Sequence, residues 1–222
     1  MKKYNFSAGP AKIDPSVIAK AKESIINYED SGMSILEISH RSSEYKKIME
    51  ELKVNLTSLL NIPDDYFILL LQGGATYQNT FLPYNYGLNN KIGCLVTGEW
   101  SKKTFEDFEL VKDNQMINLE DSKIEEFLSG DNSAYFKGTD YLHLTSNETI
   151  NGIQIRDFKE INHPSLIIDM SSDLGSYKFD WDNLKYIYAG AQKNMGIPGV
   201  TICIGDEAHL PDVKNPAYLN LK

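Results

Sequence analysis

The sequence predicts an α/β fold built on a mostly parallel sheet, and three features of the chain support this prediction. Short apolar runs of strand length recur along the chain, and segments with helically spaced apolar residues separate them. Glycine-rich or polar turns follow several runs, as is common at the carboxyl ends of parallel strands. The last two runs flank a short glycine-rich loop, which predicts a hairpin and therefore one antiparallel strand. Helices are expected on both faces of the sheet.

The composition is that of an ordinary globular protein. The 222 residues are 41% hydrophobic and 24% charged, so the chain can bury one large core or two small ones. A net charge of −9 without a basic stripe argues against a nucleic-acid partner. Because no apolar run reaches the length of a membrane span and the first residues lack a signal core, we expect a cytoplasmic protein without a membrane partner.

Both cysteines, Cys94 and Cys203, lie in apolar runs of strand character. Buried free thiols are therefore expected in place of a disulfide, and a reducing compartment is the natural one. The spacing of the two residues does not match a metal site, so no bound metal is expected.

The N-terminal part of the chain predicts an extended opening followed by two helices. Asp14 and Pro15 are typical of an N-cap and a first helical residue, and apolar residues then recur at helical spacing as far as Tyr28. A second, longer helix has one apolar face over residues 45–60 and ends before Pro63.

A strand, a glycine turn and a helix start come next. Residues 66–71 are continuously apolar, which predicts a strand covered on both faces. Residues 72–76 (QGGAT) follow at once and could form an anion cradle, because free N–H groups and the helix dipole point at one spot. A plain tight turn is the alternative.

The elements expected further along are a strand at 92–96, a helix after Gly98 through Leu110, a short strand at 117–119, a short helix at 122–128, and strands at 141–144 and 166–169.

The expected hairpin, residues 186–204, holds a lysine between its two strands. Apolar runs at 186–189 and 200–204 flank a loop that contains Lys193, and Pro198-Gly199 is a turn signal. A lysine held between buried strands can be partly desolvated, which disfavours its ammonium form and makes the amine a better nucleophile. On the loop alone, an ordinary exposed lysine is the simpler interpretation.

Several candidate functional groups lie just past the ends of expected strands. They are Gly74, Ala75, Thr76, Trp100, Thr149, Asp169, Gln192 and Lys193. Pyridoxal phosphate needs such a set: a lysine for its aldehyde, donors for its phosphate, and a carboxylate beside its ring nitrogen. Asp169 suits the ring nitrogen, and Trp100 could stack on the ring. His40 and Arg41 could hold a substrate anion. Each residue also has a simpler interpretation. Asp169 could merely cap a turn, Trp100 could be a core residue, and His40 with Arg41 could form an exposed ion pair.

Short characteristic segments are spread over essentially the whole chain: FSAGPA, EISHRSSEY, QGGAT, GEW, SNETINGI, IIDMSSD and AGAQKN. With these segments the chain resembles the phosphoserine aminotransferase family, whose members are fold-type-I enzymes dependent on pyridoxal phosphate. AGAQKN and the HRS-type segment are quite specific to this family within the wider aminotransferase group. The resemblance implies glutamate-dependent amination of 3-phosphohydroxypyruvate to phosphoserine, in serine biosynthesis, by a homodimer.

The resemblance also implies roles for the residues around the cofactor ring. Lys193 would be the Schiff-base lysine, and Asp169 the partner of the ring nitrogen. Trp100 would stack on the ring, and Thr149 would contact its edge.

A second group of residues is implied to bind anions. Ala75, Thr76 and Gln192 would hold the cofactor phosphate, and His40 with Arg41 would meet the distal anion of the substrate. Some family members have Gly-Arg in place of Ala75-Thr76, but a hydroxyl and backbone amides can still bind a phosphate.

Family members are substantially longer than this chain. Residues 1–14 are expected to form an N-terminal extended segment, and residues 15–222 the cofactor-binding large domain. Because the small C-terminal domain of the family is expected to be absent, the activity is expected to be impaired. An inactive truncated remnant is one alternative. Another is a different fold-type-I enzyme, such as a cysteine desulfurase, although both cysteines are expected to be buried. The 2-oxo acid could also be the related four-carbon phosphohydroxy acid of vitamin B6 synthesis.

Overall fold

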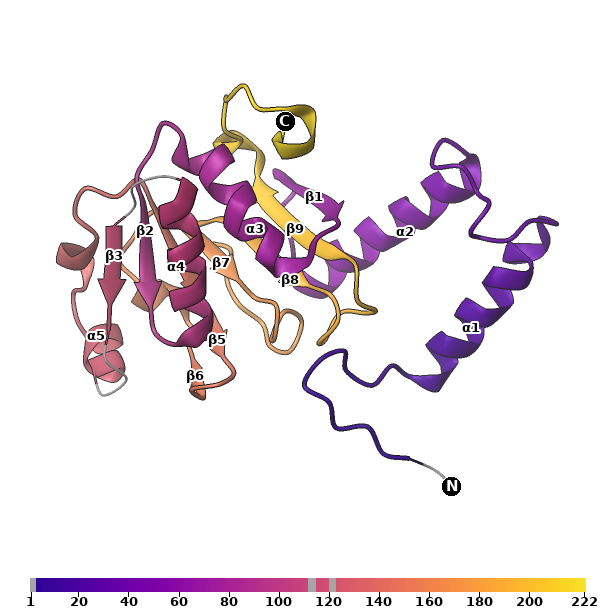
Figure 1. Ribbon diagram of the computed structural model, residues 1–222, viewed down its shortest axis with the longest axis horizontal. Coiled ribbons are helices and arrows are strands. Elements are labelled where there is room, and N and C mark those ends of the chain that lie inside the picture. The colour runs from indigo at the N-terminus through magenta and orange to yellow at the C-terminus, as the bar shows by residue number, and fades with distance from the viewer. Residues whose placement is uncertain (1–2, 112–114, 120–122) are drawn as a thin grey trace. The chain divides into compact units, whose positions relative to one another are not determined.

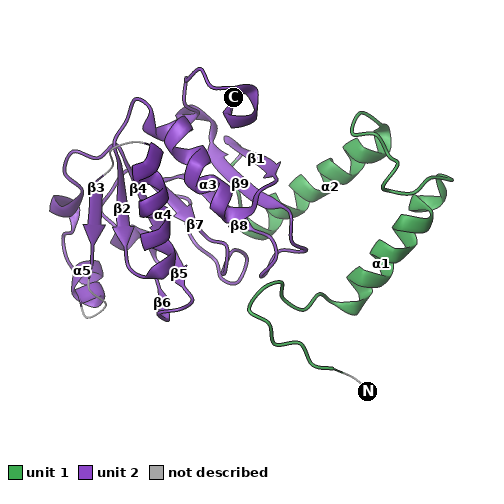
Figure 2. Ribbon diagram, viewed as in Figure 1, with its two compact units in different colours: residues 1–63 green, residues 64–222 purple. Residues whose placement is uncertain are grey.

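The computed structural model describes residues 3–111, 115–119 and 123–222, and the chain forms two compact units. The first unit is Met1–Pro63 and the second is Asp64–Lys222 (Figure 2). The boundary expected after residue 14 falls inside the first unit, which contains the extended opening together with two helices.

The two helices of the first unit begin where the sequence predicts. Helix α1 (Pro15–Ile26) starts after Asp14, whose side chain accepts a hydrogen bond from the Ser16 N–H at 2.8 Å. Helix α2 (Ser43–Leu60) ends in Asn61, which has left-handed backbone angles. The first helix is shorter than its apolar spacing predicts: Tyr28 lies in a separate 3₁₀ turn, because the extended backbone of Asn27 ends α1.

The second unit is built on a mixed sheet, seven-stranded in the described part of the chain. Its spatial order is β1 (Tyr66–Leu71), β9 (Thr201–Asp206), β8 (Leu184–Gly190), β7 (Leu166–Asp169), β4 (Tyr141–Thr145), β2 (Ile92–Val96) and β3 (Gln115–Asn118). Strand β9 runs antiparallel to both of its neighbours, and every other adjacent pair is parallel. The predicted α/β class with one antiparallel strand is confirmed.

The expectation that residues 66–71 are covered on both faces was wrong, because Ile68 is the one buried residue of strand β1 and the other five are partly exposed. The strand lies at an edge of the described sheet, where it pairs with β9. A continuous apolar run shows that a strand packs against apolar groups, but it does not fix the strand's position in the sheet. Strand β2 is the contrasting case, because it lies inside the sheet and all five of its residues are buried.

Helices α3 (Gly74–Leu82) and α4 (Glu99–Val111) lie side by side across the sheet (Figure 1). Large side chains from both helices meet aromatic residues of β8 to form the core. The fully or almost fully buried members of this core include Phe81, Leu82, Tyr86, Phe108, Tyr186, Tyr188 and Cys203. Both cysteines are buried free thiols, as predicted. The core thus fixes the starts of α3 and α4 relative to the strand ends.

Two short features complete the second unit. Strands β5 (Asn147–Glu148) and β6 (Ile153–Gln154) form a small hairpin that the sequence analysis did not anticipate. Helix α5 (Ile124–Ser129) corresponds to the helix expected over 122–128, although Ser122 lies outside the described residues. No helix of the described chain is both long enough and apolar enough to span a membrane.

Candidate active site

A cavity of about 270 Å³ lies at the carboxyl end of the parallel strands of the second unit. Its walls come from the β1–α3 turn, the start of α4, the ends of β4 and β7, and the loop after β8. Of the predicted site residues, the cavity brings together Ala75, Thr76, Trp100, Asp169, Gln192 and Lys193.

The β1–α3 turn supplies the start of a helix to this cavity. Gly73 and Gly74 both have positive φ angles, 97° and 67°, which glycine adopts readily. A Cβ on Gly73 would also lie 2.6 Å from the Cβ of Tyr77. Among the described residues no side chain caps α3, and the first residues of the helix, Gly74, Ala75 and Thr76, line the cavity. Free N–H groups at a helix start favour a bound anion.

Asp169 is the last residue of β7, and its position is held by hydrogen bonds from two neighbouring turns. Its carboxylate accepts from the Ser171 N–H at 2.8 Å, and its backbone carbonyl accepts from the Ser146 N–H at 3.0 Å. Desolvation by the surrounding protein raises the pKa of Asp169 to about 6, against the opposing effects of the Ser171 hydrogen bonds and the Lys193 charge. A nearby cation favours the charged form of a carboxylate in such a place, as the effect of Lys193 on its pKa shows.

Lys193 lies in a loop that backbone hydrogen bonds fold tightly. The Ala191 carbonyl accepts from the N–H groups of Met195 and Gly196, at 3.0 and 2.8 Å, so the chain turns around the lysine. Lys193 is half-buried, and its Nζ lies 5.5 Å from the centre of the Trp100 ring. The expected lysine between two strands is therefore present, and it faces an aromatic ring across the cavity.

Ser171 joins the aspartate turn to the lysine loop. Its N–H donates to Asp169, and its hydroxyl accepts from the Gly190 N–H at 3.1 Å. Asn194, next to Lys193, donates through its side chain to the Leu174 carbonyl at 2.6 Å. These contacts tie the segment that carries Asp169 to the loop that carries Lys193.

Thr149 is the one strand-end candidate that does not line the cavity. It is exposed, and its hydroxyl accepts a hydrogen bond from the indole Nε1–H of Trp100 at 3.0 Å. It therefore contacts the residue that forms one wall. Its predicted contact with a cofactor edge stays a prediction.

The sequence analysis missed several other lining residues, which include Asn79, Lys103, Thr104, Thr145, Asn147, Ser171 and Ser172. Thr145 is the most informative, because its buried hydroxyl has no hydrogen-bond partner in the described part of the chain. It ends β4 and pairs in register with Asp169. Its place at a strand end is the signal that could have revealed it.

His40 and Arg41 lie in the first unit, in the turn before α2. The Arg41 N–H donates to the Ser39 hydroxyl at 3.2 Å. The role expected of these two residues in binding a substrate anion stays a prediction.

Comparisons with known proteins agree on one family. The sequence profile of the class-V aminotransferases matches residues 3–219. Phosphoserine aminotransferase of Streptococcus thermophilus is 41% identical over 217 residues, which are 94% of this chain and 59% of that protein.

Solved structures give the same result. The chain matches phosphoserine aminotransferase from Bacillus circulans subsp. alkalophilus with a TM-score of 0.85 at 35% identity, over 99% of this chain and 62% of that one. It matches the enzyme with bound pyridoxal phosphate from Trichomonas vaginalis with a TM-score of 0.84 at 31% identity, over 99% and 63%. The chain therefore spans about three fifths of the length of the relatives it matches.

Proposed function

Because this chain belongs to the class-V aminotransferase family, we propose that it binds pyridoxal 5′-phosphate and moves an amino group from L-glutamate to 3-phosphohydroxypyruvate, giving phosphoserine and 2-oxoglutarate. The observation that carries the proposal is a single cavity that contains the Lys193 amine, the Asp169 carboxylate and the start of α3. This combination suits an aldehyde, a ring nitrogen and a phosphate on one molecule.

The residues of the cavity fit the cofactor. The uncapped N–H groups at the start of α3, with the Thr76 hydroxyl and the Gln192 side chain, suit a phosphate. The Trp100 ring offers a stacking surface. The unpartnered Thr145 hydroxyl is a further polar group that a ligand in the cavity could satisfy.

Two residues carry the chemistry. Bound pyridoxal phosphate supplies an aldehyde and a ring that withdraws electrons from the substrate α-carbon. Asp169 would keep the ring nitrogen protonated, because a nearby cation favours the charged form of a desolvated carboxylate. Lys193 would hold the aldehyde through its amine, and the same amine would act as the base that moves the substrate α-proton to the cofactor carbon.

Substrate binding, assembly and location are further parts of the proposal. His40 and Arg41 bind the distal phosphate of the 2-oxo acid, since a guanidinium suits phosphate oxygens. The protein works as a cytoplasmic homodimer. Exposed apolar residues on α1, including Val17, Ile18 and Ile26, support an assembly that covers them.

A stoichiometric half-reaction tests the proposal without requiring turnover. Protein loaded with pyridoxal phosphate is mixed with L-glutamate, and 2-oxoglutarate is measured per bound cofactor. We expect formation of 2-oxoglutarate up to one equivalent, followed by phosphoserine on addition of 3-phosphohydroxypyruvate. The four-carbon phosphohydroxy acid of vitamin B6 synthesis is added in a parallel sample. A faster reaction with that acid, or no 2-oxoglutarate from a loaded and folded protein, contradicts the proposed reaction.

A further inference from the structure

Glu148 is a fully buried carboxylate whose partners are backbone groups of another element. Its Oε2 accepts from the Trp100 N–H at 2.9 Å, and its Oε1 accepts from the Ser101 N–H at 2.7 Å. These N–H groups belong to the first turn of α4 and have no partner within the helix. A buried carboxylate is costly unless its hydrogen bonds are satisfied, and the positive end of a helix dipole suits it. Glu148 therefore caps α4 from a distant point in the chain.

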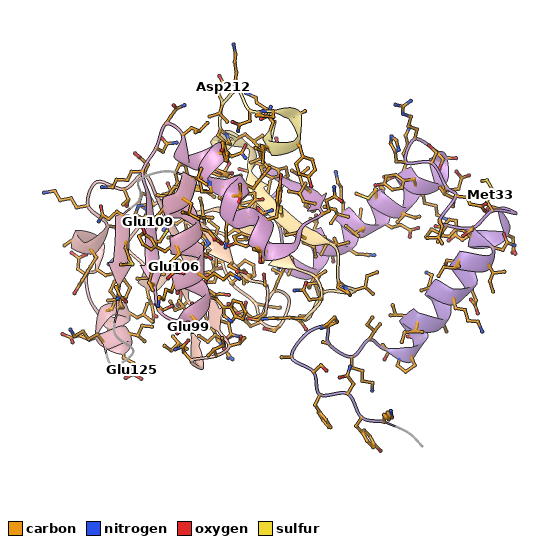
Figure 3. The ribbon with its side chains drawn as sticks, viewed as in Figure 1. Met33, Glu99, Glu106, Glu109, Glu125 and Asp212 are labelled. Carbon is orange, nitrogen blue, oxygen red and sulfur yellow. The ribbon has the colours of Figure 1, made fainter. Side chains whose placement is uncertain are left out.

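Two further hydrogen bonds join the β5–β6 hairpin to the first turn of α4. The Asn151 side-chain oxygen accepts from the Glu99 N–H at 3.1 Å. The Thr149 hydroxyl accepts from the indole N–H of Trp100. Glu99 marks this end of α4 in Figure 3, whereas Glu106 and Glu109 lie further along the helix. The hairpin thus holds Trp100 by both its backbone and its ring.

Gly98 allows this close approach. A Cβ at Gly98 would lie 2.5 Å from the Asn151 side-chain oxygen and 2.7 Å from the Glu148 Cδ. Real Cβ atoms do not approach other atoms so closely, so any larger residue would push the hairpin away from α4. The fit between hairpin and helix therefore depends on the glycine as well as on the hydrogen bonds.

The base of the hairpin is fixed to the segment that follows Asp169. Asp173 is 2% exposed, and its carboxylate accepts from the Ser146 hydroxyl at 2.6 Å and from the Gln154 side chain at 3.1 Å. Ser146 precedes the hairpin, and its backbone N–H donates to the Asp169 carbonyl at 3.0 Å. The hairpin is therefore a bridge from the aspartate at one side of the cavity to the tryptophan at another.

We propose that Glu148 and Asn151 are positioning residues that hold Trp100 over Lys193 and so fix the stacking wall of the cavity. The part of this inference that concerns cofactor binding rests on the proposed function. The part that concerns Trp100 does not, because it is a property of the free protein. A cap that served only the stability of α4 would leave the motion of the indole unchanged when helix and fold survive.

The test uses Trp100 as its own reporter. Trp181→Phe leaves one tryptophan, and a phenylalanine can keep the contacts of Trp181 with Tyr66 and Phe179. In this background, Glu148→Gln replaces one of two acceptors with a donor, and Asn151→Ala removes an acceptor from an exposed loop. Asn151→Asp keeps the acceptor and is the conservative rescue.

The matched control is Asn132→Ala. Asn132 is also buried and donates to two backbone carbonyls, those of Phe127 and Glu160, but it does not line the cavity. The control is expected to lower the melting temperature without touching Trp100. Any effect seen in the Glu148 and Asn151 variants but absent from this control is therefore local to the hairpin and α4.

Without cofactor, we expect time-resolved anisotropy to show a larger fast local motion of Trp100 in Glu148→Gln and Asn151→Ala. Asn151→Asp and Asn132→Ala should match the parent. With pyridoxal phosphate, Glu148→Gln should bind about tenfold more weakly, as expected for the loss of a hydrogen bond to a charged group. The induced circular dichroism of the bound cofactor should also be weaker in Glu148→Gln than in the parent.

Two negative results have different meanings. Unchanged Trp100 motion in folded Asn151→Ala and Glu148→Gln overturns the positioning role, whatever the cofactor does. If the parent protein binds no cofactor, the proposed function fails, and the anisotropy experiment still decides the role of the hairpin.

Discussion

Asp169 of β7 pairs in register with Tyr188 of β8. Strand β8 ends two residues later at Gly190, and Lys193 follows in the next loop. The pairing therefore brings the carboxylate and the amine to the same end of the sheet. A slip of one residue would turn the Asp169 side chain to the opposite face of the sheet.

Asp169→Asn is expected to impair the proposed chemistry far more than the fold. The amide keeps the shape of the side chain but cannot hold a proton on a ring nitrogen. We expect a loss of roughly 3 kcal/mol of transition-state stabilisation, measured as the rate of the glutamate half-reaction. Asp180→Asn, at an exposed ion pair with Lys159, is the control. A rate within a few-fold of the parent would show that Asp169 has a different role.

The same substitution should stabilise the cofactor-free protein at neutral pH. Desolvation raises the folded-state pKa of Asp169 from 3.8 to about 6, so the folded state binds the proton more tightly than the unfolded chain. Stability is therefore lost as the pH rises from about 4 to about 6. Asp169→Asn removes this loss and should gain at most about 3 kcal/mol at pH 7 and almost nothing below about pH 4.

Urea unfolding of Asp169→Asn and its parent across this pH range measures the difference in their free energies of unfolding. Asp206→Asn is a control in which the change in stability with pH should have the opposite sign. Burial alone would raise the pKa of Asp206, but hydrogen bonds from the Ala208 N–H, Lys185 and His209 lower it overall. Asp206→Asn should therefore lose stability at neutral pH, and the loss should shrink in acid. A difference between Asp169→Asn and its parent that does not change with pH would mean that Asp169 is not desolvated.

Gly98→Ala should separate the β5–β6 hairpin from α4. The added methyl group overlaps Asn151 and Glu148, so we expect a loss of about 1–3 kcal/mol in urea unfolding, together with weaker cofactor binding. Gly130→Ala is the matched control, because its Cβ would meet only the Glu126 carbonyl at an ordinary 3.6 Å. Equal effects of the two substitutions would show that the close approach at Gly98 is unimportant.

Thr145→Val tests whether the unpartnered hydroxyl serves a ligand. Losing a hydroxyl without a partner should change the stability of the free protein by less than about 1 kcal/mol. If the hydroxyl contacts the bound cofactor, affinity should fall. Thr201→Val is the control, since the Thr201 hydroxyl is also buried and unpartnered among the described residues but does not line the cavity. Cofactor titration by absorbance should separate the two variants, and identical affinities would rule out a role for Thr145.

Much of the sheet could be predicted because each strand is a short apolar run followed by a turn. The placement of Asp169 and Lys193 at one cavity could be predicted because parallel strands bring their carboxyl ends together, so polar residues at those ends converge. The edge position of β1 was not predictable, since pairing partners far along the chain decide it.

The β5–β6 hairpin was missed for a different reason. Each of its strands has two residues, too few for an alternating pattern, and its main role is to cap another element. Glu148 looks like an ordinary polar loop residue in the sequence. Only the fold shows that its carboxylate meets the first turn of α4, which begins 49 residues earlier at Glu99.

The most direct test of the whole account is the site of covalent attachment of pyridoxal phosphate. Two lysines, Lys193 and Lys103, line the cavity, so the position of the adduct discriminates between them. The loaded protein is reduced with borohydride, digested and mapped by mass spectrometry, with Lys193→Ala and Lys103→Ala in parallel. We expect one pyridoxyl group on Lys193, lost in Lys193→Ala and retained in Lys103→Ala. An adduct on Lys103 or on any other lysine, or none in a folded sample, would contradict the account.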